Sequence, residues 1–118
     1  MKGSVNLSIN NGIGKIEFFH PQSNSLPTSI LRDLASTIHD CGKNEKIKII
    51  ILQSKGERVF CAGASFDELS SISNYEEGKS FFMGFANVIN ACRKCPKLII
   101  CRVQGKAVGG GVGLACAG

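Results

Sequence analysis

The sequence predicts an α/β domain built on a mainly parallel sheet, and two observations carry that prediction. Two near-continuous apolar runs, "IKIIILQS" from Ile47 and "LIICRVQ" from Leu98, are typical of strands that a sheet buries on both faces. Amphipathic segments with helical spacing precede and separate these runs. Strands that alternate with helices favour parallel pairing through right-handed crossovers, and 118 residues suit one domain.

The first element is a hairpin. "SVNLSIN", residues 4–10, alternates apolar and polar residues, "NNG" marks a turn, and "IGKIEFFH" continues as a second strand through Phe19. "HPQSNSLP" then predicts a loop, with Pro27 at an early position of the helix that follows. The apolar stripe of that helix consists of Ile30, Leu31, Leu34 and Ile38, and Gly42 is its candidate C-cap.

The middle of the chain predicts a loop and two helices. "SKGERVFCAGAS" is expected to be a loop that leads into a short helix beginning near Phe66. A longer helix follows over about residues 74–93, and Pro96 marks its break. Its apolar face is predicted to comprise Phe81, Phe82, Phe85, Val88, Ile89 and Cys92. After the second buried strand, a glycine-rich turn opens a last apolar helix.

Charge and hydropathy set limits on the partners. Fourteen basic and nine acidic residues give a net charge of +5, which would suit nucleic acid or a phosphorylated ligand. No Lys/Arg run exceeds two residues, so a solvated basic surface is the simpler interpretation and no nucleic-acid partner is expected. The sequence has no apolar run of about 18 residues and no apolar N-terminal stretch, so we expect a cytoplasmic protein without a membrane partner. No Asp or Glu follows Glu77.

Six cysteines raise the question of a metal or redox site. Cys92 and Cys95 have C-x-x-C spacing, but a zinc site needs a second such pair, and both histidines lie far away in the sequence. Without a secretory signal, disulfides are not expected either. We therefore predict no metal site, and buried reduced thiols that pack as small apolar groups.

Two segments share a pattern that can carry chemistry. In each, a buried strand runs into a loop of small residues and then a helix: "IIIL" leads to "FCAGAS", and "LIICRV" leads to "GKAVGGG". Two such loops that face each other can aim two backbone N–H groups at one oxygen, which makes an oxyanion hole. Close helix packing or a positive φ also explains the glycines. A phosphate-binding loop fits less well, because the Walker Ser/Thr and the G-x-G-x-x-G spacing are missing.

These motifs together resemble a known family. "FCAGASFDEL", followed further along by "CPKLIICRVQGKAVGGGVGLACA", is similar to the enoyl-CoA hydratase/isomerase (crotonase) family. "HPQSNSLPTSILRDL" and "KIKIIILQSKGERVFCAGA" fit the family in order and spacing, so the resemblance covers essentially the whole chain. It implies an α/β crotonase-like spiral of ββα units, an acyl-CoA substrate, and a homotrimer or hexamer in the full-length protein. Coenzyme A would be part of the substrate thioester, with no separate cofactor.

The resemblance also implies residue roles. The backbone N–H groups of Ala64 and Gly110 would form the oxyanion hole that stabilises a thioester enolate. The residues implied in substrate binding are Ser25, Leu26, Ala62, Ala64, Ser65, Phe66, Asp67, Gly109 and Gly110. Hydration, double-bond isomerisation and related enolate chemistry all remain open.

The chain departs from the family in two respects. Two-glutamate hydratases carry a glutamate three positions after the oxyanion glycine, and here that position is Gly113, which favours isomerase-like or atypical hydratase chemistry. Family members are also considerably longer. The resemblance therefore implies that residues 1–118 are the N-terminal portion of one crotonase-like domain whose C-terminal part is absent from this chain. We expect this portion alone to be inactive and its acid/base to lie beyond residue 118.

Other interpretations stay open. Asp67, Glu68, Glu76 and Glu77 are acid/base candidates, but solvated surface carboxylates are the favoured interpretation, and Asp67 is expected to cap or orient its short helix. His20 could approach the substrate loop or be an ordinary turn histidine. The first alternative function is a catalytically silent acyl-CoA-binding or scaffolding subunit of the same fold. The second is a basic nucleic-acid binder.

Overall fold

A computed structural model describes residues 2–118. Four strands form the main sheet in the order β1-β2-β4-β7, with bounds β1 Ser4–Asn10, β2 Ile13–Phe19, β4 Ile49–Ser54 and β7 Leu98–Cys101. The predicted hairpin is confirmed: β1 and β2 are antiparallel around Asn11 and Gly12, whose φ angles are 52° and 82°. Such positive φ angles are those of a type I′ hairpin turn. The strands β2, β4 and β7 run parallel, as predicted.

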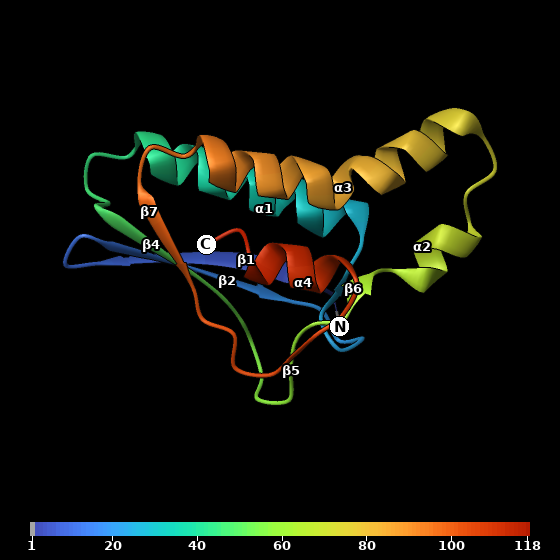
Figure 1. The fold of residues 1–118 in the computed structure, drawn as a ribbon, viewed down its shortest axis with the longest axis horizontal. Coiled ribbons are helices and arrows are strands. Elements are labelled where there is room, and N and C mark those ends of the chain that lie inside the picture. Colours follow the sequence, from blue (N-terminus) through green and yellow to red (C-terminus); the bar gives the residue numbers. More distant parts are fainter. Residues whose placement is uncertain (1) are drawn as a thin grey trace.

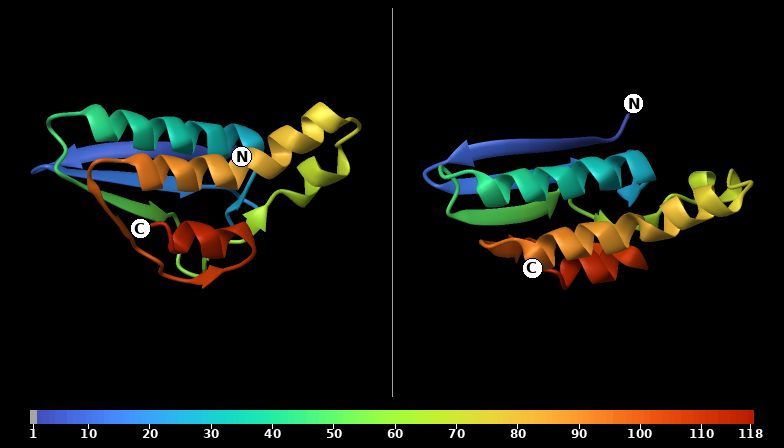
Figure 2. Two further views of the ribbon diagram at one scale, coloured as in Figure 1. Left: turned by 45° about the horizontal axis from the view of Figure 1, so that its top comes forward. Right: turned by 90° about the horizontal axis from the view of Figure 1, so that it is seen from above.

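Two long helices cover one face of this sheet (Figures 1 and 2). They are α1 (Thr28–Lys43) and α3 (Tyr75–Lys94), and they run side by side. A Cβ atom on Gly84 would lie 2.7 Å from Leu31 Cδ1, so the end of the Leu31 side chain occupies the space that glycine leaves between the two helices. Two short helices complete the described residues, α2 (Phe66–Ser70) and α4 (Gly110–Ala115).

Two short parallel ladders lie beside the main sheet. β3 (Ser25–Leu26) pairs with β6 (Gly63–Ala64), and β5 (Val59–Cys61) pairs with β8 (Lys106–Ala107). The sequence predicts loops for these segments, because strands this short show no periodicity. A long strand, a short strand and a helix recur three times: β2 and β3 lead to α1, β4 and β5 lead through β6 and α2 to α3, and β7 and β8 lead to α4. This is the repeated ββα unit that the resemblance implies.

The core lies between the sheet and the helices. Phe18 of β2 and Phe60 of β5 meet edge to face, with ring centroids 5.3 Å apart. The fully buried side chains around them are Ile16, Leu26, Leu34, Ile38, Ile47, Ile50, Leu52, Val88 and Leu114. They come from the sheet, from three helices and from the short strands, so this core fixes the loops next to it.

The strands β4 and β7 are not buried on both faces, contrary to the prediction. Ile50 and Ile99 point into the core, whereas Leu98 and Ile100 are 64% and 48% exposed. The register places Ile13, Ile49 and Leu98 side by side on the outer face. In residues 2–118 the helices cover the opposite face only, so this outer face stays open (Figure 1).

Two details of the helices differ from the prediction. Gly42 lies inside the last turn of α1, and the C-cap is Asn44. A Cβ on Gly42 would lie 3.1 Å from Pro96 Cδ, so the small residue makes room for Pro96. Phe82, predicted on the buried face of α3, is 71% exposed. It is rotated about 100° from Phe81, which takes the inward position. None of the helices within residues 2–118 is long and apolar enough to cross a membrane.

Both ends of α1 are capped by distant residues of opposite charge. The local N-cap, Pro27, provides no side-chain hydrogen bond, and no acid lies in the first turn. Glu68 of α2 takes that role, since its Oε1 accepts from the Thr28 amide at 3.0 Å and from the Thr28 hydroxyl. At the other end Lys97 Nζ donates to the carbonyls of Cys41, at 2.7 Å, and Asn44. Each charge complements the helix dipole at its end.

Candidate functional site

The two glycine- and alanine-rich loops meet where β6 passes the start of α4. Gly63 has a φ of 94°, and a Cβ built on it would lie 3.0 Å from the Val108 carbonyl oxygen and 3.6 Å from the Gly110 amide nitrogen. Only glycine fits here, for both conformation and space. The peptide that carries Ala64 therefore lies directly beside the peptide that carries Gly110.

Gly110 is the first residue of α4. The amides of Gly111 and Val112 donate to the carbonyls of Val108 and Gly109, at 2.9 and 3.0 Å. Residues at the start of a helix have no earlier helical carbonyl as partner, so the Gly110 N–H is not used by α4. Gly109, with φ 56°, turns the chain so that this N–H lies at the junction of the loops.

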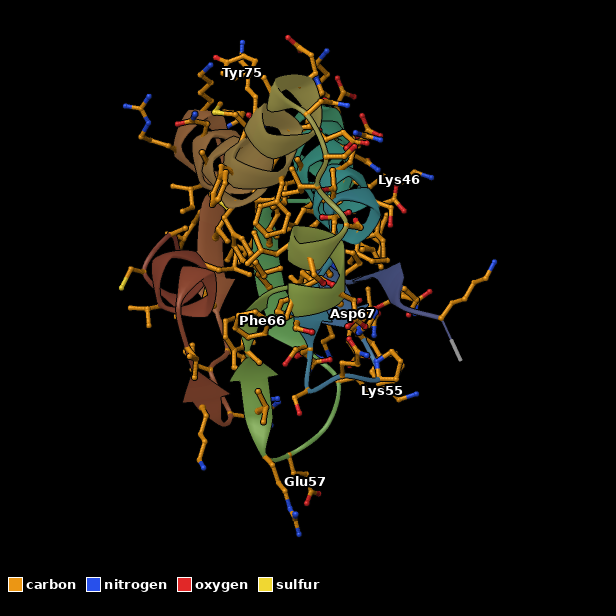
Figure 3. All side chains as sticks on the ribbon, turned by 90° about the vertical axis from the view of Figure 1, so that its right-hand side faces the viewer. Lys46, Lys55, Glu57, Phe66, Asp67 and Tyr75 are labelled. Carbon is orange, nitrogen blue, oxygen red and sulfur yellow. The ribbon has the colours of Figure 1, made fainter. Side chains whose placement is uncertain are left out.

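Ala64 occupies the other loop and is fixed from both sides. It pairs with Leu26 in the β3–β6 ladder. The next residue, Ser65, is 5% exposed and caps α2, because its hydroxyl accepts from the Glu68 amide at 3.2 Å. Figure 3 shows Phe66 and Asp67 at the start of α2, and Phe66 is 79% exposed.

The structure brings the predicted substrate-binding residues together. Ser25 and Leu26 are buried in β3 and lie beside Gly63 and Ala64. The Ala62 amide donates to the Asn24 carbonyl at 3.4 Å, next to the same ladder. The whole predicted set (Ser25, Leu26, Ala62, Ala64, Ser65, Phe66, Asp67, Gly109 and Gly110) thus lies in or next to β3, β6 and the start of α4.

Close backbone packing explains most of the glycines in the second loop. A Cβ on Gly105 would lie 2.8 Å from the Val59 amide nitrogen and overlap the Arg58 carbonyl. A Cβ on Gly111 would overlap the Cys61 carbonyl, and one on Gly110 would lie 2.7 Å from the Phe85 ring. Close packing, one of the two interpretations of the glycines, thus holds for these three positions, and ligand approach stays a prediction.

The four carboxylates proposed as acid/base candidates have different surroundings in the structure. Asp67 Oδ2 accepts from Gln22 Nε2 at 3.0 Å, and Glu68 caps α1. Glu77 accepts from the Ser73 amide and hydroxyl, and these hydrogen bonds, led by the amide, lower the pKa of the Glu77 carboxyl. Glu68 and Glu77 thus fix the starts of helices, and Asp67 ties α2 to the first loop. Glu76 is exposed in the first turn of α3.

The histidine candidate takes a structural position. His20 Nδ1 accepts from the Gln22 amide at 3.2 Å within the first loop.

An open cleft of about 370 Å³ lies between α2, α3 and the start of α1, away from Ala64 and Gly110. Its lining residues are Thr28, Glu68, Ser71, Ile72, Glu76, Glu77, Ser80 and Phe81.

Two buried cysteines are held in the thiol form. Burial raises the pKa of Cys61 from 9.0 to about 11, partly offset by a hydrogen bond from the Gly63 amide. Burial raises the pKa of Cys92 to about 12. A high pKa keeps the nucleophilic thiolate scarce at neutral pH. Within residues 2–118 no three His, Cys, Asp or Glu side chains gather as metal ligands would.

Comparison with known proteins settles the relationship that the motifs suggest. The sequence model of the enoyl-CoA hydratase/isomerase family matches residues 8–118. The chain belongs to this family. Within the enoyl-CoA hydratase/isomerase family it is 33% identical over 116 residues to the human mitochondrial methylglutaconyl-CoA hydratase. It is 32% identical over 117 residues to the ethylmalonyl-CoA decarboxylase of Xenopus tropicalis.

The solved structures confirm the crotonase-like α/β fold. The crystal structure of an enoyl-CoA hydratase from Bacillus anthracis superposes with a TM-score of 0.87 at 26% identity, covering 99% of this chain. The chain spans 32% of the human relative, 39% of the Xenopus relative and 45% of the Bacillus enzyme. The match therefore concerns less than half of each of these family members.

Sequence reasoning does not find the role of three residues that fix the site. The sequence suggests Glu68 only as an acid/base, whereas the Glu68 side chain links α2 to α1. Asn24 and Gln104 both hydrogen-bond to the Val59 carbonyl between the two loops. A polar residue within a turn motif gives no sequence signal of so distant a contact.

Proposed function

We propose that the protein is an acyl-CoA enzyme that stabilises a thioester enolate between the backbone amides of Ala64 and Gly110. The observation that carries this proposal is the junction of the two loops, where the Gly110 nitrogen lies 3.6 Å from the Cβ position of Gly63. Any side chain at residue 63 would fill that space. Family membership makes a coenzyme A thioester the substrate class to test first.

The proposed chemistry is proton transfer at the carbon next to the thioester carbonyl. Removal of that proton moves negative charge onto the carbonyl oxygen. Two N–H donors placed about 3 Å from this oxygen stabilise the charge more in the enolate than in the ground state. Each donor of this kind contributes about 2.7–4 kcal/mol.

The overall reaction is proposed only to the level of the enolate. Gly113 provides no carboxylate, so two-glutamate hydration is not the leading candidate, and isomerisation or atypical hydration is favoured. The named relatives include a hydratase and a decarboxylase at nearly equal identity, 33% and 32%. Identity alone therefore does not choose between reactions.

The test is deuterium incorporation at the α-carbon. The full-length protein, with the C-terminal part and the acid/base expected beyond residue 118, is incubated with a panel of acyl-CoA thioesters in D₂O, and mass spectrometry follows mass gain and product formation. We expect exchange of the α-hydrogen in at least one thioester. Binding without exchange for every thioester would refute the enzyme and support the silent acyl-CoA-binding or scaffolding subunit. Salt-dependent RNA binding with no acyl-CoA affinity would support the nucleic-acid binder instead.

We propose that coenzyme A enters only as part of the substrate, and that the protein assembles as a homotrimer or hexamer in the cytoplasm. Sedimentation velocity of the full chain tests the assembly. A monomer at micromolar concentration would contradict it.

A further inference from the structure

Two side-chain amides from distant parts of the chain meet at one backbone carbonyl. Asn24 Nδ2 donates to the Val59 carbonyl at 3.1 Å, and Gln104 Nε2 donates to the same oxygen at 3.3 Å. Val59 is the first residue of β5, which leads into the loop that carries Ala64. A carbonyl oxygen has two lone pairs, so it can accept both bonds.

Both amides also bind the turn that precedes β5. Asn24 Nδ2 donates to the Lys55 carbonyl at 3.0 Å, and Gln104 Nε2 donates to the Gly56 carbonyl at 2.9 Å. Gln104 Nε2 also donates to Ser54 Oγ at 3.0 Å, and Ser54 Oγ in turn donates to the Val59 carbonyl at 3.4 Å. An amide nitrogen carries two protons, so the 3.3 Å bond from Gln104 to Val59 shares a proton with one of its two shorter bonds. Residues 54–59 are thus held from two sides. We call residues 54–59 the anchor turn; its tip, at Glu57, extends away from the rest of the molecule (Figure 3).

Asn24 connects the anchor turn to the Ala64 side of the site. Its side chain is buried, its φ is 56°, and its Oδ1 accepts from the His20 amide at 2.9 Å. The next residue begins β3, which pairs with the β6 strand that contains Ala64. A shift of Asn24 therefore moves the strand that sets the position of the Ala64 amide.

Gln104 connects the same turn to the Gly110 side. It precedes Gly105, which packs on the Arg58–Val59 peptide, and β8, where the Lys106 amide donates to the Arg58 carbonyl at 3.1 Å. β8 continues directly to Gly110. Gln104 Oε1 is buried without a hydrogen-bond partner among the described residues. The hydrogen bonds that Nε2 donates therefore have to offset the free-energy cost of burying this amide.

We propose that Asn24 and Gln104 are positioning residues that hold the two candidate oxyanion donors at a fixed separation through the Val59 carbonyl. This inference rests on the proposed function for its effect on catalysis. Neither side chain needs to touch the substrate. Small misplacements of groups that act on the reacting atoms reduce rates strongly, by up to about a hundredfold for 1 Å.

The first experiment needs no ligand. Amide hydrogen exchange is measured on the full chain and on Asn24→Gly, which tolerates the positive φ, and Gln104→Met, which keeps the side-chain length. We expect faster exchange at both loops, residues 62–65 and 105–111, in each variant. The controls are Gln53→Met and Asn44→Ala, whose side chains make hydrogen bonds of 3.0 and 2.9 Å elsewhere. If each variant loosened only its own loop, or neither, the proposal would be overturned.

The second experiment measures α-hydrogen exchange in D₂O with butanoyl-CoA. Each single variant is expected to lower kcat about tenfold or more with KM little changed, because the donors are displaced rather than the binding surface. Both amides act through one carbonyl, so the double variant should lose much less than the product of the single losses. Multiplicative losses, or a change in KM alone, would contradict the shared anchor.

The experiments distinguish a failure of the proposed acyl-CoA function from a failure of the positioning role of Asn24 and Gln104. No α-hydrogen exchange in the unmutated chain would count against the proposed function, while the ligand-free exchange data still decide the positioning role. Gln104→Glu keeps the length but replaces the donor with an acceptor, and it should be as damaging as Gln104→Met. If Asn24→Gly does not fold, Asn24→Ser, which keeps a shorter donor, replaces it in the cycle.

Discussion

The loop around Ala64 and the loop around Gly110 lie side by side, yet different forces hold them. The first is fixed by polar side chains: Asn24 on the turn before it, Ser65 at the cap of α2, and Glu68 on α1. The second is fixed by close packing of backbone on backbone: Cβ atoms on Gly105 and Gly111 would overlap the backbone of the first loop. Apart from Gly63, positions in the first loop are therefore expected to tolerate substitutions that Gly105 and Gly111 do not.

The largest expected effect concerns the Gly110 donor. A Cβ at this position meets Phe85, so Gly110→Pro alone would mix a clash with loss of the N–H. In a Phe85→Ala background, Gly110→Ala keeps the N–H and Gly110→Pro removes it. We expect the proline variant to lose about 2.7–4 kcal/mol of transition-state stabilisation relative to the alanine variant, measured as kcat/KM for α-hydrogen exchange. Equal rates in the two folded variants would remove Gly110 from the oxyanion hole.

The next effect tests backbone packing in the second loop. Gly105→Ala places a methyl group against the Arg58–Val59 peptide, and neither backbone segment can rotate away. We expect the free energy of unfolding to fall by about 1–3 kcal/mol in urea titration. The matched control is Gly78→Ala in α3, where a Cβ has space at 3.7 Å from Ile72. That change should stabilise the protein by roughly 0.5–1 kcal/mol, since alanine favours helix. Similar losses at both positions would contradict the packing argument.

The pH dependence of the free energy of unfolding tests the burial of the Cys61 thiol. The thiol pKa is raised from 9.0 to about 11 in the folded protein. As the pH rises above 9.0, the unfolded chain loses this proton while the folded chain keeps it, so stability is full below that pH and falls as pH rises towards 11. The expected slope is roughly 1.4 kcal/mol per pH unit for one thiol.

Urea titrations between pH 8 and 11 measure this slope, and Cys61→Ala is expected to flatten it. Cys92→Ala should flatten it as well, because the Cys92 pKa is raised to about 12. A slope that neither variant changes would show that burial of the Cys61 and Cys92 thiols does not cause the alkaline loss of stability.

The smallest expected effect concerns the capping of α1 by the Glu68 carboxylate beside the first loop. Glu68→Ala removes the carboxylate that caps α1, and loss of a cap costs about 1 kcal/mol of stability. Glu68→Gln keeps an acceptor and should cost less. Glu76→Ala, an exposed residue in the first turn of α3, is the comparison variant. Thermal unfolding distinguishes the three, and equal melting temperatures for the Glu68 and Glu76 variants would refute the cap.

The long elements are predictable from sequence because their burial repeats with a regular period. The strand β2 and the helices α1 and α3 follow patterns of alternation or helical spacing, and each has an apolar side against the core. The strand β1 alternates as well, but only its Val5 packs on the core, while Leu7 and Ile9 are 41% and 42% exposed. The position of Phe82 is not predictable in this way, because two adjacent aromatic residues cannot both lie at the centre of one helical stripe. The sequence also overstates the burial of β4 and β7, since apolar composition does not say whether a second layer covers the sheet.

The candidate site is predictable only through its backbone. The small residues of both loops are visible in the sequence, because the close approach of two backbone segments demands small side chains. Asn24 and Gln104 give no such signal, since they act on a carbonyl 35 and 45 residues away. Short ladders such as β3–β6 are likewise set by tertiary contact rather than local propensity.

The capping of α1 has a consequence for biosynthesis. The ribosome makes residues 28–43 well before Glu68 and Lys97, which complete the two ends of that helix. During translation the helix therefore emerges with both ends open to water and to chaperones, and it becomes fully capped only when the segment before β7 has left the exit tunnel. The two ends of α1 are thus completed in the order of synthesis, first by Glu68 and then by Lys97.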